Sequence, residues 1–261
     1  MKNLRLIFEY CKLNLSASME YRAAFVTQVL GMVLNNSAFI LFWIILYNKA
    51  GSSIEGYSFQ NIMFLWSLAP LGFGIASVLF GNSLFISRII YSGELDVFML
   101  QPKPLILNML SSKMNVSGWG DMAYGIILFF ITQPLTLPQF ALFITFSAAM
   151  AGVLVGIRLF YHSFTFFFGN AEDFASMASE TVLSLMLYPG TIFKGPVVWL
   201  FRTVFPAVWI AFVPVQLIQN WNTGLFVLTI GADAVILGLG ILLFRLGLRN
   251  YESGNRIGAR M

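Results

Sequence analysis

Two long stretches without a charged side chain most constrain how this chain can fold. The first lies between Arg22 and Lys49, and the second between Glu55 and Arg88. A helix needs about 20 apolar residues to cross the hydrocarbon layer of a membrane, so each stretch predicts one transmembrane helix. The composition agrees, because 58% of the residues are hydrophobic and only 10% are charged. A soluble domain needs more surface charge, so we expect an all-α integral membrane protein.

A third apolar region is divided by Pro134 and Pro138. Two prolines so close together mark a turn, and the region therefore predicts a helical hairpin. If its first arm began only after Asp121, too few residues would remain before the turn to span the membrane. Asp121 is therefore predicted to lie within the membrane helix.

The second half of the chain is less regular. Residues 169–180 form a short, polar and acidic segment, predicted to be a loop that begins a helix. Residues 174–193 are a weak candidate span, and residues 197–218 are apolar but interrupted by an arginine and two prolines. Residues 225–244 form a good last helix.

Orientation is predicted from the basic residues that flank the spans, which favour the cytoplasm. They fall in three groups: Lys2, Arg5, Lys12 and Arg22; Arg88, Lys103 and Lys113; and Arg245, Arg249, Arg256 and Arg260. All three groups reach the cytoplasm only if either residues 174–193 or residues 197–218 fail to cross, and the proline-broken segment 197–218 is the better candidate. We therefore expect six transmembrane helices, cytoplasmic N and C termini, and a re-entrant extracellular-side hairpin (residues 188–222) between spans five and six.

The first eighteen residues are not expected to be a signal peptide, because Glu9 and Lys12 interrupt any apolar core. Apolar side chains instead recur at helical spacing on one face: Leu4, Ile7, Phe8, Cys11 and Leu15. This pattern is typical of a helix that lies in the membrane interface. Residues 1–18 are therefore predicted to be an N-terminal amphipathic interface helix.

Several kinds of site are disfavoured. Cys11 is the only cysteine and His162 the only histidine, so the sequence offers no disulfide within the chain and few ligands for a metal. His162 is expected to be a helix residue near a membrane boundary. The basic residues lie at the edges of apolar runs rather than in a stripe, which disfavours nucleic acid as a partner.

The segment of residues 87–113 predicts a cytosolic surface, with the sequence SRIIYSGELDVFMLQPKPLILNMLSSK. Gly93 breaks the first helix, an amphipathic piece runs over residues 94–100, and the two prolines that follow cannot continue a helix. Leu95, Phe98 and Met99 lie among the acidic residues of this piece. From spacing alone, it is either a helix that docks on a partner or a helix that lies on the membrane surface.

Part of this segment resembles the G-x-L-D-x-x-L-x-x-P-x-P signature of a family of bacterial type-2 ABC exporter permeases. The corresponding residues, with Met99 where the signature has leucine, are Gly93, Glu94, Leu95, Asp96, Val97, Phe98, Met99, Leu100, Gln101, Pro102, Lys103 and Pro104. A second signature of that family, an aromatic-Pro pair followed by a Pro-rich apolar stretch, is similar to the region containing Tyr188, Pro189, Pro206 and Pro214. The resemblance covers nearly the whole chain.

The resemblance implies a non-catalytic permease subunit of an ABC exporter in the bacterial cytoplasmic (inner) membrane. Residues 93–104 would couple it to a separate cytosolic ABC ATPase, present in two copies, that binds ATP and Mg²⁺. The implied second permease is a related but different chain, or otherwise a second copy of this one, and membrane lipid surrounds both. The chain itself has no G-x-x-x-x-G-K-[ST] sequence, so no cofactor is expected in it.

Three charges are expected inside the membrane: Asp121, Arg158 and Asp233. A lone charge at the bilayer centre costs about 3 kcal/mol, so each should have a partner or water. We predict a structural ion pair between Asp121 and Arg158 on adjacent antiparallel helices. Asp233 is predicted to face a dimer interface or a polar cavity. Four asparagines are expected to pack helices or mark their ends: Asn35, Asn36, Asn82 and Asn108.

Two other classes of membrane protein stay open as alternatives, a secondary transporter and a membrane-embedded lipid-modifying enzyme. A transporter of that kind is expected to show an internal repeat, and none is visible in the sequence. An enzyme is expected to cluster its catalytic acids or histidines, whereas the acids here are dispersed. The Phe- and Met-rich spans suit a lipid-like cargo, but they equally suit helices that only face lipid.

Overall fold

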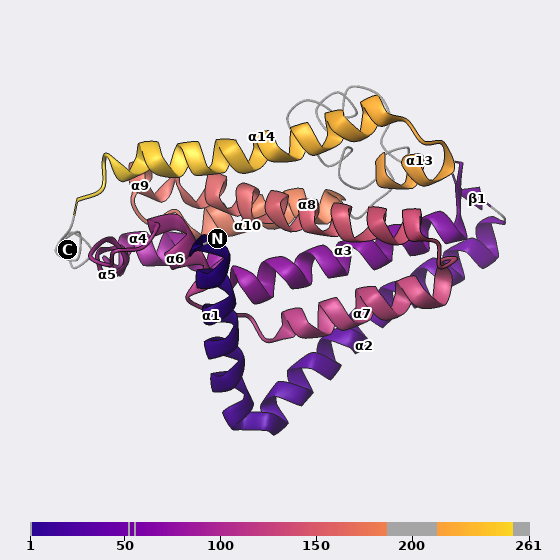
Figure 1. Ribbon diagram of the computed structural model, residues 1–261, viewed down its shortest axis with the longest axis horizontal. Coiled ribbons are helices and arrows are strands. Elements are labelled where there is room, and N and C mark those ends of the chain that lie inside the picture. Colours follow the sequence, from indigo (N-terminus) through magenta and orange to yellow (C-terminus); the bar gives the residue numbers. More distant parts are fainter. Residues whose placement is uncertain (1, 52, 55, 187–212, 253–261) are drawn as a thin grey trace.

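The long helices run alongside one another in the computed structural model, which describes residues 2–51, 53–54, 56–186 and 213–252 (Figure 1). They are α2 (Arg22–Ala50), α3 (Phe59–Leu79), α7 (Ser117–Thr132), α8 (Leu137–His162) and α14 (Thr223–Leu248). The first two correspond to the two uncharged stretches, and α14 corresponds to the expected last helix. The predicted all-α class is supported, because the regular structure of the described residues is helical apart from two strands of two residues each.

By length and hydropathy, four helical stretches of the described residues can cross a membrane. They are Lys2–Lys49, Phe59–Leu79, Leu137–Phe168 and Thr223–Leu248. Helix α7 has 16 residues and α10 (Glu172–Met186) has 15, so both are shorter than these. Asp121 lies in α7 and Arg158 in α8, as predicted from the position of the turn.

Helix α3 lies at the centre of the bundle and packs against α7 and α8. Its residues from Ile62 to Leu71 are buried on every side, which an all-round apolar sequence permits. By contrast, most of α2 is exposed, and only five residues of α14 are buried. Large apolar side chains on these two helices, such as Leu41 and Val227, therefore face lipid or another chain.

The predicted hairpin is confirmed, and its turn lies between α7 and α8. Pro138 falls in the first turn of α8, where proline costs no intrahelical hydrogen bond. The expected loop at residues 169–180 is shorter than predicted, because α10 already begins at Glu172. The Asn170 side chain accepts a hydrogen bond from the Glu172 N–H at 3.2 Å, and two acidic residues in the first turn favour a helix N-terminus.

Helices α8 and α14 approach each other closely at two glycines. A Cβ atom placed on Gly156 would lie 2.7 Å from the Leu237 Cα, and a Cβ on Gly240 would meet the Gly156 backbone. Small residues at such a crossing let helix backbones touch inside a membrane.

One end of the bundle carries most of the short elements. These are α4 (Ile86–Tyr91), α5 (Leu95–Met99), α6 (Leu105–Ser111) and α9 (Thr165–Phe168), together with the end of α14. Helix α1 (Lys2–Ser18) runs across the same end and joins α2 through a short 3₁₀ turn, Met19–Tyr21 (Figure 1). Residues 2–18 are thus helical, as predicted, and this helix runs in a different direction from the long helices of the bundle (Figure 1).

The opposite end carries the turn of the α7–α8 hairpin, helix α13 (Val213–Gln219) and a small β-hairpin (Figure 1). Strands β1 (Ser53–Ile54) and β2 (Tyr57–Ser58) pair in antiparallel register, and the Tyr47 hydroxyl donates to the Tyr57 carbonyl oxygen at 2.8 Å. The sequence analysis did not anticipate these strands.

Most of the expected re-entrant hairpin lies outside the described residues, including Tyr188, Pro189 and Pro206. Pro214 is described, and it is buried in the first turn of α13.

Candidate functional site

The segment of residues 87–113 folds into three short helices at one tip of the molecule (Figure 1). Gly93 separates α4 from α5 with a φ of +77°, a backbone conformation that favours glycine. Pro102 and Pro104 separate α5 from α6, as the sequence predicted. Glu94 precedes α5, whose first turn contains Asp96.

The apolar side chains of α5 divide between an inner and an outer face. Leu95 is 0% exposed and Phe98 packs against the core, so both hold the helix to the bundle. Val97 and Met99 are exposed, and Leu100 at the end of the helix is 85% exposed. We call Val97, Met99 and Leu100 the tip surface. It differs from the expected docking residues, because Leu95 and Phe98 point inward.

Asp96 is directed toward the segment that follows α14. Burial, together with the negative charge of Asp96, raises the pKa of the Tyr251 phenol to about 12. The Tyr251 ring also makes an edge-to-face contact with Phe166 of α9, with 6.0 Å between ring centroids. Tyr251 therefore connects α5 to α9 and to the end of α14.

Helix α1 is attached to this tip by polar contacts. The Tyr10 hydroxyl donates to Asn108 Oδ1 at 2.6 Å, and Lys103 Nζ donates to the Tyr10 oxygen at 3.1 Å while lying 5.0 Å from the ring centroid. Asn14 Nδ2 donates to the Ser111 carbonyl oxygen at 3.3 Å. Asn108 in turn donates to Gln101 Oε1 at 3.2 Å. Helix α1, the QPKP turn and α6 thus form one hydrogen-bonded unit.

A buried polar cluster joins the start of the tip to the end of α8. Thr165 Oγ1 donates to Ser87 Oγ at 2.8 Å, and Ser87 Oγ lies 2.7 Å from His162 Nδ1. Because Ser87 accepts from Thr165, its own hydroxyl hydrogen can be donated to His162 Nδ1. His162 is therefore a hydrogen-bonded core residue, and it anchors α4 to α8.

Arg158 lies one turn before His162 and is also buried. Its Nη1 donates to Ser83 Oγ at 3.2 Å, and Glu180 of α10 supplies a favourable electrostatic interaction. The Arg158 charge is thus held by α10 and the turn that follows α3.

The predicted Asp121–Arg158 ion pair is wrong. Asp121 Oδ1 accepts a hydrogen bond from Asn36 Nδ2 at 2.7 Å, and no ion pair joins Asp121 to Arg158 in the described structure. The position of α3 decides this outcome, because α3 packs against both α7 and α8, while α7 also packs against α2, which carries Asn36. Asn36 was expected only to pack helices, and it is the partner of the buried carboxylate.

Asp121 and Asn36 line a small polar cavity of about 230 Å³ among α2, α3, α7 and α10. Glu180 and Ser184 contribute from α10, and aromatic walls come from Phe39 and Trp66, whose rings stack with centroids 4.9 Å apart. We call this the polar cavity. It is the place where described acidic side chains of two different helices face one space.

Asp233 is buried in α14, and neither of its carboxylate oxygens has a hydrogen-bond partner among the described residues. That Asp233 faces a dimer interface or a polar cavity stays a prediction. Within the same residues, no group of three His, Cys, Asp or Glu side chains could hold a metal ion.

The sequence analysis missed several residues of these contacts. Tyr10, Ser83, Ser87 and Tyr251 each join two distant parts of the chain through the contacts above. A polar residue within an apolar run, such as Ser83 or Asn36, is a usable signal, because polar groups in membrane helices seek a partner. Tyr10, in the middle of α1, and Tyr251, which follows α14, give no comparable signal.

Comparison with known proteins gives one result. A family model described as ABC-2 family transporter protein matches residues 33–255. No curated protein and no solved structure matches the chain. The matched range includes the tip, every residue that lines the polar cavity except Met32, and α14, but not α1.

Proposed function

Because the chain belongs to the ABC-2 transporter family, we propose that it is the permease subunit of an ABC exporter and couples to a separate cytosolic ATPase. The observation that carries the coupling is the tip surface. Val97, Met99 and Leu100 have exposed apolar side chains, and α5 lies at one end of the bundle, where a soluble partner can reach it (Figure 1). An apolar helix face of this kind suits insertion into a groove of a partner.

The contacts behind the tip surface favour transmission of movement. Leu95 fixes α5 to the core, Asn108 fixes α6 to α1, and Ser87 fixes α4 to α8. A push on the tip surface is thus passed to the long helices as a rigid-body displacement rather than absorbed by a loose loop.

The proposed topology has six crossings, with the tip and both termini in the cytoplasm. Helix α1, the tip and the end of α14 lie at one end of the bundle, as this topology requires (Figure 1). The re-entrant hairpin at residues 188–222 belongs to the same proposal. The membrane is proposed to be the bacterial cytoplasmic membrane.

The complete exporter is proposed to contain two permeases over two copies of the ATPase, which bind ATP and Mg²⁺. The second permease is a related chain or another copy of this one. The exposed faces of α2 and α14 offer surface for this pairing. The polar cavity opens beside α2, and we assign it to this chain's half of the translocation pathway.

The test is to purify the tagged chain from its own membrane and to identify the proteins that accompany it. We expect an ABC ATPase and ATP hydrolysis by the complex. Leu100→Asp should abolish ATPase co-purification, because it places a charge in the apolar contact. Leu135→Asp is the matched control, since Leu135 is equally apolar and exposed but lies in the turn at the opposite end.

Absence of an ABC ATPase from the purified wild-type complex would overturn the exporter assignment. Equal ATPase recovery with both variants would instead overturn the coupling role of the tip surface.

A further inference from the structure

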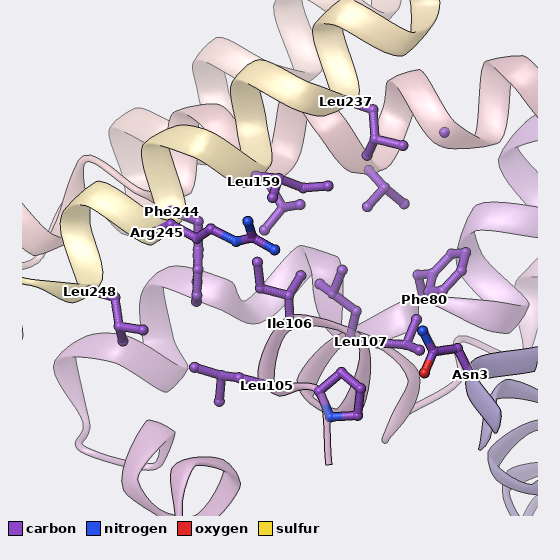
Figure 2. Close-up of a pocket in the computed structure, with 15 residues that line it drawn as sticks. Asn3, Phe80, Leu105, Ile106, Leu107, Leu159, Leu237, Phe244, Arg245 and Leu248 are labelled. Atoms are coloured by element: carbon purple, nitrogen blue, oxygen red, sulfur yellow. The ribbon is translucent and has the colours of Figure 1, made fainter.

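A cavity of about 530 Å³ lies between α6, α8 and α14, beside the start of α1 (Figure 2). Pockets of about 300–1,000 Å³ are typical of sites that bind small molecules. This cavity is separate from the polar cavity, with which it shares no lining residue. Neither the tip surface nor the buried polar cluster opens into it.

The lining is apolar except at two places. Asn3 lies near Phe80 at one end, and Arg245 is the only charged residue among the 15 that line the cavity (Figure 2). No acidic side chain lines it. The chemistry of the wall therefore suits a hydrocarbon chain that carries a negative charge at one end.

The length of the cavity matches one leaflet of a membrane. Leu237 and Leu248 both line it and are eleven positions apart on α14. At about 1.5 Å per residue, this separation corresponds to about 16 Å along the helix. Half of a hydrocarbon core of about 30 Å is about 15 Å, so an acyl chain of one leaflet fits along it.

Arg245 is the candidate for binding the headgroup; it lies eight positions from Leu237 and three from Leu248, which leaves about 12 Å along α14 for the acyl chain. It is in the last turn of α14, and its guanidinium extends from α14 toward Ile106 of α6 (Figure 2). Arg245 is exposed, and in the described structure no carboxylate forms an ion pair with it. An arginine with free donors binds a phosphate oxygen well, because its planar fork matches phosphate geometry.

We propose that this cavity binds an anionic phospholipid of the leaflet that faces the tip, with one acyl chain in the cavity and the phosphate on Arg245. Under the proposed orientation this is the cytoplasmic leaflet, and only the identity of the leaflet rests on the proposed function. Leu105 and Ile106 of α6 line the cavity, so the bound lipid also supports the segment that follows the tip surface.

The test uses the purified chain in nanodiscs of phosphatidylcholine that contain a small fraction of phosphatidylglycerol with a photoactivatable acyl chain. Phosphatidylcholine with the same photoactivatable chain serves as the neutral comparison. After irradiation, labelled peptides are identified by mass spectrometry. Labelling of α6 and α14 should favour phosphatidylglycerol about fivefold, the factor equivalent to about 1 kcal/mol for one basic side chain at an anionic surface.

Two pairs of variants make the result specific. Arg245→Gln should bring the two lipids to equal labelling, whereas Arg249→Gln should keep the preference, because Arg249 does not line the cavity. Gly152→Leu should reduce labelling by both lipids, since a Cβ on Gly152 has only one atom within 4 Å, at 3.8 Å, and a longer side chain would fill the cavity. Gly231→Leu is the control, with no atom near its Cβ and no place in the lining.

Equal labelling of the wild type by the two lipids would overturn the proposal, as would a preference that Arg245→Gln leaves unchanged. If Arg245→Gln fails to fold, the lipid preference of the wild type and the comparison of Gly152→Leu with Gly231→Leu still test the proposal. The experiment contains no ATPase and measures no transport, so its failure is distinct from failure of the exporter assignment.

Discussion

Asn36 Nδ2 donates a 2.7 Å hydrogen bond to Asp121 Oδ1, and this contact joins α2 to α7 inside the bundle. Asn36→Ala should lower the free energy of unfolding in detergent by about 1–3 kcal/mol, because it leaves a buried carboxylate without its donor. Asn35→Ala is the matched control, since Asn35 is exposed and makes only a 3.9 Å contact with Met32 Sδ. Equal stability of the two variants would contradict the role of this hydrogen bond.

The same geometry predicts the outcome of a charge exchange. Asp121→Arg combined with Arg158→Asp should not restore folded protein relative to either single variant, because the two side chains do not meet. The measurement is the yield of monodisperse protein from membranes. Recovery in the double variant would instead support an ion pair.

The sequence predicted the helix that contains Asp121 but not the partner of its side chain. The uncharged stretches and the two prolines predicted α2, α3 and the α7–α8 hairpin, because span length and helix breaking are local properties. The partner of Asp121 depends on which helices pack against α7, mainly α2 and α3, and no local pattern records that arrangement. The signal available was Asn36, a strongly polar side chain within an apolar span.

The sequence also did not predict which side chains of α5 face the core. The helix has five residues, so its apolar side chains do not repeat often enough to define one face. Leu95 and Val97 look alike in the sequence, but only Leu95 is enclosed. The β-hairpin near Tyr57 was missed because strands of two residues have no alternating pattern to detect.

Because Leu95 is buried and Leu100 is exposed, we expect alanine at Leu95 to lower stability and alanine at Leu100 to weaken ATPase binding. Leu95→Ala should destabilise the chain by about 2–5 kcal/mol through the cavity it creates. Leu100→Ala should leave the melting temperature unchanged and weaken only ATPase binding, since Leu100 is exposed. Thermal unfolding of both variants, alongside ATPase co-purification, separates the two roles. A stability loss in Leu100→Ala that equals the loss in Leu95→Ala would contradict the inner and outer faces assigned to α5.

The attachment of α1 to the tip is tested at Tyr10. Tyr10→Phe removes the hydroxyl that donates to Asn108 and accepts from Lys103, at a cost of about 1 kcal/mol. We expect faster amide hydrogen exchange in α1 and α6, and little change elsewhere. Tyr21→Phe serves as the control, because Tyr21 is exposed on the 3₁₀ turn. Unchanged exchange in α6 would mean that α1 is held by other contacts.

The crossing of α8 and α14 depends on Gly240. Gly240→Leu should separate the helices and destabilise the chain by about 1–3 kcal/mol or more, because the new side chain overlaps the Gly156 backbone. Gly238→Leu, on the same helix, has no atom within 4 Å of its Cβ and should be tolerated. Thermal unfolding in detergent compares them. Similar melting temperatures for both variants would show that this close approach is dispensable.

Tyr251 gives a prediction that depends on pH. Burial and then the Asp96 charge raise its pKa from the ordinary 10.0 to about 12. Because the pKa is higher in the folded state, the neutral Tyr251 phenol stabilises the fold. This contribution is complete below about pH 10 and is lost as the pH rises through about 12. Asp96→Asn should lower the Tyr251 pKa toward 10 without reaching it, since burial remains. Alkaline absorbance titration, taken as the difference from Tyr251→Phe, measures this value, and an unchanged pKa in Asp96→Asn would show that Asp96 does not act on Tyr251.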